Sequence, residues 1–208
     1  MYETFEKLPE SKKNDILQVC IEEFAINGYE NTSTNTIVKR LGISKGVLFL
    51  YFRNKRSLYL YLVDHVLESL TSKFLEHFHD QGQEKMFDVF DHFDHMGKYY
   101  KDLMQKNTYD FKFILGAMLE APMELREEID VRHNRSHERL FKMINTDKFR
   151  KDIDPKMVMD LLLIISHHIE TIVVKQYKNR EGNLIEDIDK YVDMLDKYLS
   201  IIKYGVYE

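Results

Sequence analysis

Six basic side chains and no acidic one lie between Asn31 and Leu60. The chain has 208 residues and a formal net charge of −5, so this segment has the opposite sign to the whole. Lysine and arginine gathered in this way favour a polyanion such as a nucleic acid. The chemistry that they predict is the binding of phosphates. These six residues, the basic island, are Lys39, Arg40, Lys45, Arg53, Lys55 and Arg56.

Two short helices joined by a glycine turn are predicted to position the basic island. Thr32 or Ser33 can cap the first helix, and Ser44 can cap the second. In the second helix Leu48 and Phe52 are four residues apart and can face inward together, which leaves the residues around them facing outward. This arrangement predicts a helix-turn-helix whose second helix enters the major groove of DNA.

The rest of the chain is also predicted to be helical. It has only 3 Pro and 8 Gly, 44% of its residues are hydrophobic, and no strand pattern is visible. The predicted helices cover about residues 9–27, 32–41, 44–53, 54–82, 84–106, 109–119, 122–145, 156–177 and 184–204. We expect an all-α fold of about nine helices, with a three-helix DNA-binding domain at residues 1–54 and a larger helical domain at residues 55–208.

The last two predicted helices carry more apolar surface than one intrachain contact would bury. Residues 156–177 are apolar around much of the helix, and apolar residues in the final helix repeat at spacings of 3 and 4. Pairing with the same helices of a second subunit would complete a four-helix bundle. The predicted homodimer interface consists of Leu161, Ile165, Ile169, Ile172, Ile188, Tyr191, Leu195, Tyr198 and Ile202.

Nine histidines offer a competing chemistry. Glu76 and His79 have the Glu-x-x-His spacing of helical di-iron sites, and His92 with His95 can share a helix face. Two ligands do not define a metal site, so histidines on the surface or lining a pocket are the alternative interpretation. No nucleophile-and-base signature and no phosphate-binding glycine loop is visible. We predict no catalytic residue, no metal and no cofactor, and we keep a ferritin-like metalloprotein or enzyme as the alternative hypothesis.

The cellular compartment follows from the cysteine content and the N-terminus. Cys20 is the single cysteine, which excludes an intramolecular disulfide and fits a reducing compartment. The first twenty residues show no export signal. The strongest apolar run, at residues 157–174, is interrupted by charged residues and histidines. We therefore expect a cytoplasmic protein without a membrane partner.

From Ile16 to about Leu62 the chain carries an ordered set of residues: Ile16, Phe24, Gly28-Tyr29, Thr32-Ser33, Ile37, Gly42-Ile43-Ser44-Lys45-Gly46, Leu48, Tyr51-Phe52, Asn54-Lys55 and Leu58. This set resembles the tetracycline-repressor (TetR) family of bacterial transcriptional regulators and keeps that family's spacing without a gap. The rest of the chain is similar to that family only in length and helical pattern. The resemblance implies a homodimeric, ligand-responsive repressor that binds a palindromic operator, in the bacterial cytoplasm and on the nucleoid when bound to DNA. A transcriptional activator is the alternative.

The resemblance also implies which residues touch the DNA. Free N–H groups and hydroxyls at the starts of the two short helices suit phosphate oxygens, which agrees with the family's contacts. Tyr51 and Lys55 match positions that usually hold the DNA backbone. The implied DNA-binding residues are Ser33, Thr34, Ser44, Lys45, Gly46, Val47, Phe49, Leu50, Tyr51 and Lys55.

Three of these residues depart from the family pattern. Val47 stands where the family often has Thr, Phe49 where it often has Tyr, and Leu50 where it often has a polar or aromatic residue. Valine and leucine can pack on the C5-methyl group of thymine, so we predict an operator rich in A·T under the second short helix. The alternative interpretation is that Phe49 or Leu50 packs inside the protein and reads no base.

In this family the helices of the larger domain enclose a cavity for an effector. The chain offers methionine and aromatic side chains there, which would suit a small apolar or amphipathic molecule. Its binding would shift the long connecting helix and change the separation of the two DNA-binding heads. The alternative interpretation is that most of these side chains are ordinary core. The implied effector-binding residues are Phe90, Phe93, Met104, Phe111, Leu115, Met118, His137 and Phe141.

Overall fold

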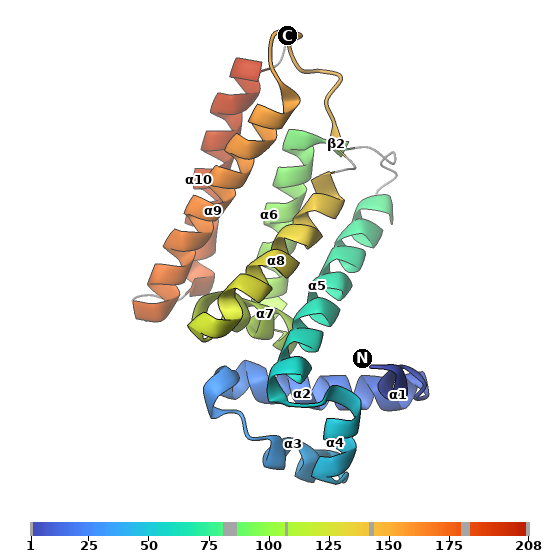
Figure 1. Ribbon diagram of the computed structural model, residues 1–208. Coiled ribbons are helices and arrows are strands. Elements are labelled where there is room, and N and C mark those ends of the chain that lie inside the picture. Colours follow the sequence, from blue (N-terminus) through green and yellow to red (C-terminus); the bar gives the residue numbers. More distant parts are fainter. Residues whose placement is uncertain (1, 81–86, 107, 142–143, 180–183, 207–208) are drawn as a thin grey trace. The chain divides into compact units, whose positions relative to one another are not determined.

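The computed structural model describes residues 2–80, 87–106, 108–141, 144–179 and 184–206. Within these ranges the chain forms ten helices and one pair of two-residue strands (Figure 1). The predicted all-α class is confirmed, although a short helix before Pro9 and the strand pair were not predicted. The elements are α1 (Glu3–Glu6), α2 (Glu10–Asn31), α3 (Thr34–Leu41), α4 (Lys45–Phe52), α5 (Lys55–Asp80), β1 (Phe87–Asp88), α6 (Val89–Lys106), α7 (Tyr109–Glu120), α8 (Met123–Phe141), β2 (Ile144–Asn145), α9 (Pro155–Asn179) and α10 (Leu184–Val206).

The chain divides into two compact units. The first unit contains Met1–Lys73 and Asn107–Arg139, and the second contains Phe74–Lys106 and Leu140–Glu208. The first unit therefore holds α7 and most of α8 together with the N-terminal helices, whereas the predicted boundary at residue 54 divides the chain by function. That functional boundary stays a prediction.

Side-chain caps set the starts of the helices around the predicted turn. Ser33 Oγ accepts a hydrogen bond from the Asn35 amide at 3.3 Å, and Ser44 Oγ accepts one from the Val47 amide at 3.2 Å. Gly42 ends α3 with a φ of 64°, which glycine adopts without a Cβ penalty. Asn54 Oδ1 accepts from the Ser57 amide at 2.8 Å at the start of α5. The caps predicted at Ser44 and Asn54 are confirmed, and Ser33 caps α3 in preference to Thr32.

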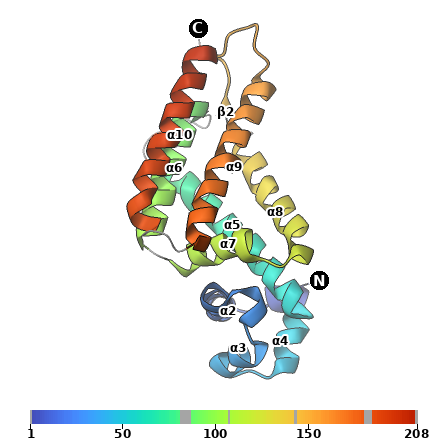
Figure 2. The ribbon, with the colours of Figure 1, turned by 90° about the vertical axis from the view of Figure 1, so that its left-hand side faces the viewer.

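The core of the first unit forms around α2. Figure 2 shows α2 between α3 and α7. Helix α1 also contributes to this core. Its Phe5 is fully buried, and the centre of the Phe5 ring lies 4.7 Å from that of the Phe52 ring on α4. Cys20 is fully buried on α2, and burial raises the pKa of its thiol to about 12. The cysteine is therefore a small core residue, as an inert buried thiol should be.

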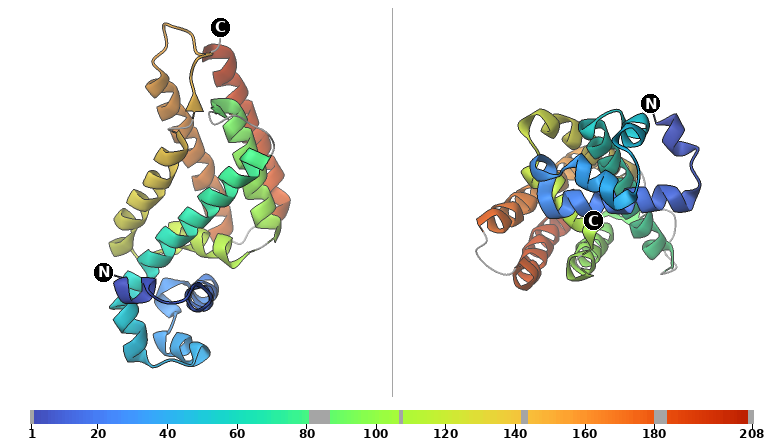
Figure 3. Two further views of the ribbon diagram at one scale, coloured as in Figure 1. Left: turned by 90° about the vertical axis from the view of Figure 1, so that its right-hand side faces the viewer. Right: turned by 90° about the horizontal axis from the view of Figure 1, so that it is seen from below.

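In the second unit α10 packs against both α6 and α9 (Figure 3). Asp154 caps α9 by accepting from the Lys156 amide at 2.9 Å, as its place before Pro155 predicts. The strands pair in parallel, with Phe87 opposite Ile144 and Asp88 opposite Asn145. None of the helices in the described ranges is long and apolar enough to cross a membrane. The core of this unit consists of Phe74, Val89, Phe90, Phe93, Ile144, Phe149, Val158, Leu162, Leu199 and Val206.

Candidate nucleic-acid interface

Helix α4 has one buried face and one exposed face. Leu48 and Phe52 are fully buried, as their spacing predicts. On the other side Lys45 and Gly46 are exposed, Val47 and Phe49 are half-buried, and Leu50 is 63% exposed. Because a buried apolar row holds α4 in place, the outward row stays available to a partner molecule.

The starts of α3 and α4 supply hydroxyls and free backbone N–H groups. Ser33 and Ser44 are exposed at the two N-caps, and Thr34 at the first position of α3 is half-buried. The first turn of a helix leaves N–H groups without intrahelical partners and carries a partial positive charge. Phosphate oxygens are the ligands that such a terminus favours.

Three residues of the basic island, which we call the presented cations, are available to an external anion. Lys39, Lys45 and Arg53 are exposed, and none of them has an ion pair within the described part of the chain. The Lys45 ammonium lies 5.7 Å from the centre of the Phe49 ring, which limits its side-chain freedom. Lys39 and Arg53 were not among the predicted DNA-binding residues, although their positions in the basic island contained the signal.

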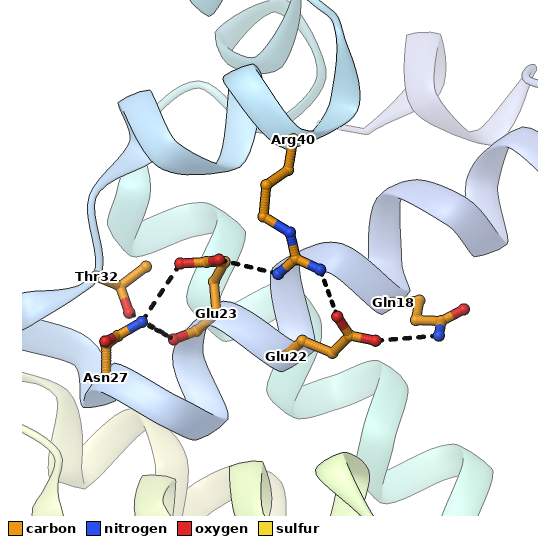
Figure 4. A network of polar contacts seen from close by, with 6 residues as sticks. All are labelled: Gln18, Glu22, Glu23, Asn27, Thr32 and Arg40. Carbon is orange, nitrogen blue, oxygen red and sulfur yellow. Dashed lines mark hydrogen bonds and ion pairs between the residues drawn. The ribbon is translucent and has the colours of Figure 1, made fainter.

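Arg40 is exposed but already paired with carboxylates of its own chain. Figure 4 shows its side chain reaching from α3 to α2, between Glu22 and Glu23. Its guanidinium donates to Glu22 Oε2 at 2.5 Å and to Glu23 Oε1 at 2.9 Å. The hydrogen bond from Arg40 holds the pKa of the Glu22 carboxyl below its usual value. Arg40 therefore fixes α3 on α2, a role that its charge alone did not reveal.

The two carboxylates have further partners on α2. Gln18 Nε2 donates to Glu22 Oε1 at 3.0 Å, and Asn27 Nδ2 donates to Glu23 Oε2 at 3.3 Å. Only 11% of the Glu23 side chain is exposed, so these donors replace the water that its oxygens would otherwise bind. Figure 4 shows the whole row, from Gln18 to Asn27, along one side of α2.

Lys55 and Arg56 are also engaged within the first unit. The Lys55 ammonium donates to the backbone oxygen of Glu30 at 3.1 Å and lies 4.8 Å from the centre of the Tyr29 ring. Burial lowers the pKa of Lys55 below its ordinary value. Arg56 donates to the backbone oxygen of Glu124 at 3.1 Å and pairs with the Glu128 carboxylate on α8. With Arg40, these residues form a group that we call the anchored cations.

Tyr51 and Lys55 are less accessible than the family resemblance implies. Tyr51 is 7% exposed, and its ring lies 5.8 Å from that of Phe5. Lys55 is half-buried and already has intramolecular partners. Their phosphate contacts stay predictions, and the presented cations make better candidates.

The implied effector-binding residues lie in different parts of the fold. Phe90 and Phe93 are packed in the core of the second unit, whereas Phe111, Leu115 and Met118 are half-buried on α7 in the first unit. The side chains of Met104, His137 and Phe141 lie outside the described residues.

Two cavities of the first unit are lined mainly by polar residues. A cavity of about 330 Å³ lies between α2, α5 and the start of α7, and one of about 400 Å³ lies between α5 and α8. Neither is lined by a predicted effector-binding residue. The lining of the larger cavity is Tyr61, Asp64, His65, Leu67, Glu68, Arg132, Arg135 and Ser136.

The predicted dimer interface divides between buried and exposed positions. Ile169 and Tyr191 are buried within their own subunit, and Ile165, Ile172, Leu195 and Ile202 are partly covered. Leu161 and Tyr198 are exposed, and the side chain of Ile188 lies outside the described residues. The 3 and 4 spacing on α10 thus marks mainly an intrachain seam. Large apolar side chains nearby are exposed instead: Met157, Leu163 and Ile164 on α9, with Ile201 and Tyr204 on α10.

The histidines form no metal site in the described part of the chain. His92 is fully buried on α6 with its ring against Phe74. No group of three or more histidine, cysteine, aspartate or glutamate side chains gathers among the described residues. The side chain of His79 lies outside those residues, as does that of His137.

Comparison with known proteins supports this view of the N-terminal helices. The family model for bacterial regulatory proteins of the tetR family matches residues 16–62. The fatty acid metabolism regulator protein of Bacillus subtilis (strain 168) is 28% identical over 74 residues. That match spans 36% of this chain and 36% of the length of the relative.

Solved structures share the fold over almost the full chain. A TetR transcriptional regulator from Chloroflexus aurantiacus J-10-FL has a TM-score of 0.67 at 16% identity, covering 92% of this chain and 95% of that one. The fatty acid degradation regulator FadR from Bacillus halodurans has a TM-score of 0.62 at 16% identity, covering 91% and 96%. FadR from Bacillus subtilis in complex with stearoyl-CoA has a TM-score of 0.57 at 16% identity, covering 88% and 96%. Residues 16–62 thus match the family model for bacterial regulatory proteins of the tetR family, and the chain as a whole shares its fold with these solved structures.

Proposed function

We propose that the chain is a DNA-binding transcriptional regulator that acts as a homodimer and represses transcription by occupying a palindromic operator. The observation that carries the proposal is that the presented cations are exposed and that α3 and α4 have capped starts, all within residues 16–62. The comparisons do not favour the ferritin-like alternative. The activity is binding rather than a covalent step, and the site of action is the bacterial cytoplasm.

In the proposed contact with DNA, some residues bind phosphates and others contact the base edges. Lys39, Lys45 and Arg53 supply charge for phosphates, while Ser33 and Ser44 bring hydroxyls and helix N-termini to the same backbone. Helix α4 offers its exposed row to the base edges. Two such heads in a symmetric dimer would meet half-sites about 34 to 36 Å apart on one side of the duplex.

The dimer would form through the exposed apolar side chains of α9 and α10. Ile164 on α9 is 64% exposed and Ile201 on α10 is 71% exposed. The exposure of several large apolar side chains to water is unfavourable. Covering them with the same helices of a second subunit would bury both rows at once.

An Ile164→Glu variant tests this dimer. We expect it to sediment as a monomer, because a carboxylate in an apolar interface would lose its water without a partner. Ile26→Glu is the matched control, since Ile26 is 63% exposed on α2. A wild-type chain that sediments only as a monomer would contradict the proposed dimer.

The effector in this proposal is a long-chain acyl thioester or a similar amphipathic molecule. Support comes from the similarity to a fatty acid metabolism regulator and to a FadR bound to stearoyl-CoA. The cavity between α5 and α8 adds Arg135, an exposed cation suited to an anionic group.

Stearoyl-CoA is the probe for this effector. We expect it to raise the melting temperature and to weaken operator binding, because a ligand stabilises the state that it prefers. An Arg135→Ala variant should reduce both effects. Coenzyme A without the acyl chain is the control, and an equal effect of this compound would contradict the apolar part of the proposal.

Selection of bound fragments from the parent genome tests the function as a whole. The purified protein should enrich palindromic sequences, and its affinity for them should fall steeply with salt as phosphate counterions are released. A protein that binds duplex DNA with no salt dependence, or not at all, would overturn the proposal.

A further inference from the structure

We propose that Val47 and Leu50 read the C5-methyl groups of thymines, so that each operator half-site presents thymine beneath the middle of α4. This inference rests on the proposed DNA-binding function and names the chemistry that the operator must display. It turns on the exposed row of α4, which we call the methyl-reading row and define as Gly46, Val47 and Leu50.

The three residues of the methyl-reading row lie on one side of α4. Leu50 follows Val47 by three residues and Gly46 by four, and both spacings bring residues together on a helix surface. The opposite side is occupied by Leu48 and Phe52, which are fully buried and fix the rotation of the helix. The row therefore faces away from the protein.

Most of the Leu50 side chain is left uncovered by the protein. It is 63% exposed, whereas its neighbour Tyr51 is 7% exposed. Val47 is half-buried and extends the same apolar surface toward the start of the helix. An apolar side chain on a surface meant for DNA removes hydrogen bonds to bases, but it can gain contact with a methyl group.

Gly46 supplies an independent observation. A Cβ at this position would meet only the Ser44 hydroxyl, at 3.8 Å, so the protein has room for a side chain. Gly46 is the second residue of α4, and glycine has a lower helix propensity than alanine. A close approach of the α4 backbone to a partner molecule explains the missing side chain, and it would bring Val47 and Leu50 within reach of base edges.

Thymine is the base that fits this row. In the major groove only A·T pairs display a methyl group, and valine and leucine offer no hydrogen bond that would prefer another base. Among the side chains of α4 that face outward, Lys45 alone is charged, and it remains for a phosphate or a guanine. The specificity of α4 for its half-site therefore depends mainly on shape and methyl contacts.

Replacing single thymines of the selected operator by deoxyuridine tests the inference directly. This change removes the methyl group and leaves the base-pairing groups unchanged. We expect an affinity loss of about fourfold for each methyl removed from under α4, the equivalent of about 0.8 kcal/mol. Uracil at positions away from the two α4 helices should have no effect.

Variants of the methyl-reading row complete the test. A Val47→Ala, Leu50→Ala double variant should bind the thymine and uracil operators equally, because both partners of the methyl groups are gone. Ile26→Ala, at an equally exposed residue of α2, should keep the wild-type preference for thymine. Gly46→Ala should weaken operator binding while its melting temperature equals or exceeds that of the wild type.

The outcomes separate this inference from the proposed function. A protein that binds its operator in a salt-dependent way, but equally well with thymine or uracil under α4, would overturn the methyl reading and leave the regulator intact. A Gly46→Ala variant with full operator affinity would also count against it. Loss of all duplex binding by the wild type would instead overturn the proposed function. The uracil measurement uses the wild-type protein, so it does not depend on the folding of any variant.

Discussion

The presented and the anchored cations belong to one basic island but have different roles: the presented cations are available to an external anion, and the anchored cations make contacts within the protein. Lys45 is exposed at the start of α4, whereas Arg40, five residues earlier, lies between Glu22 and Glu23. The island has a charge of +6 in the sequence, yet half of that charge is already used within the first unit. The comparison teaches that a count of basic residues overstates the charge available to DNA.

The positions of the presented cations also depend on the anchored cations. The anchored cations hold α3 on α2 and the start of α5 on α2 and α8. These contacts position the helices that carry the presented cations. Removing a presented cation should change affinity with no loss of stability. Removing an anchored cation should change stability first, and DNA binding only through the misplaced helices.

The largest effect is expected from removing the presented cations together. A Lys39→Ala, Lys45→Ala, Arg53→Ala triple variant should lose roughly three orders of magnitude in operator affinity. Each cation that contacts a phosphate releases a counterion from the DNA, and the variant lacks this gain for all three contacts. Fluorescence anisotropy on the selected operator measures this loss. The melting temperature should stay at the wild-type value.

A second triple variant provides the control for total charge. Lys151, Lys156 and Lys190 are exposed in the second unit, and their replacement by alanine removes the same charge. Equal losses of affinity in the two triple variants would show that only net charge matters, and the division into two groups would fail.

The next largest effect is expected from Arg40→Ala. The variant should lose about 1 to 2 kcal/mol of unfolding free energy, since the nearly buried Glu23 side chain would lose the hydrogen bond from the guanidinium. Chemical denaturation measures this loss. Cys20 offers a local readout, because its thiol is fully buried in the wild type and should react faster with a thiol reagent in the variant.

A smaller effect is expected at the contact between Arg56 and Glu128. Their side chains are 44% and 41% exposed, so the ion pair is screened by water. Arg56→Ala should therefore lose less than about 1 kcal/mol of unfolding free energy. Replacing both residues by alanine in a double-mutant cycle isolates the pair. If Arg56→Ala lost as much unfolding free energy as Arg40→Ala, the ion pair between Arg56 and Glu128 would stabilise the first unit more than its exposure predicts.

The smallest effect concerns pH. The Glu22 carboxyl has a folded-state pKa below its ordinary value of 4.5 because Arg40 donates to its charged form. A lowered pKa gives stability that is fully present above pH 4.5 and is lost as the pH falls through the folded-state value. The difference in stability between wild type and Arg40→Ala should thus narrow below pH 4.5. A difference that stays constant from about pH 7 to about pH 3 would contradict this role of Glu22.

Much of the fold was predictable because its signals are local. Ser44 and Asn54 cap their helices where the sequence places them, and Leu48 and Phe52 turn inward as their spacing requires. Gly42 takes the left-handed conformation that a tight turn needs. Each of these features depends on residues within one or two turns of the chain.

Features that depend on distant residues were not predictable in the same way. Arg40 meets carboxylates 17 and 18 positions earlier, and Arg56 meets a glutamate 72 positions later. The spacing on α10 correctly marked a helix seam, but it did not show that Tyr191 would face its own subunit. Periodicity identifies an apolar face, whereas the partner of that face is set by packing.

The salt dependence of operator binding for the six single alanine variants of the basic island tests the central claim most directly. For each variant, the logarithm of the affinity is plotted against the logarithm of the salt concentration. Replacing Lys39, Lys45 or Arg53 should reduce the steepness of this plot by about one for each phosphate contact that is lost. The slope should keep its wild-type value for Arg40, Lys55 and Arg56 at temperatures where these variants are folded. Equal reductions of the slope for all six residues would contradict the division into presented and anchored cations.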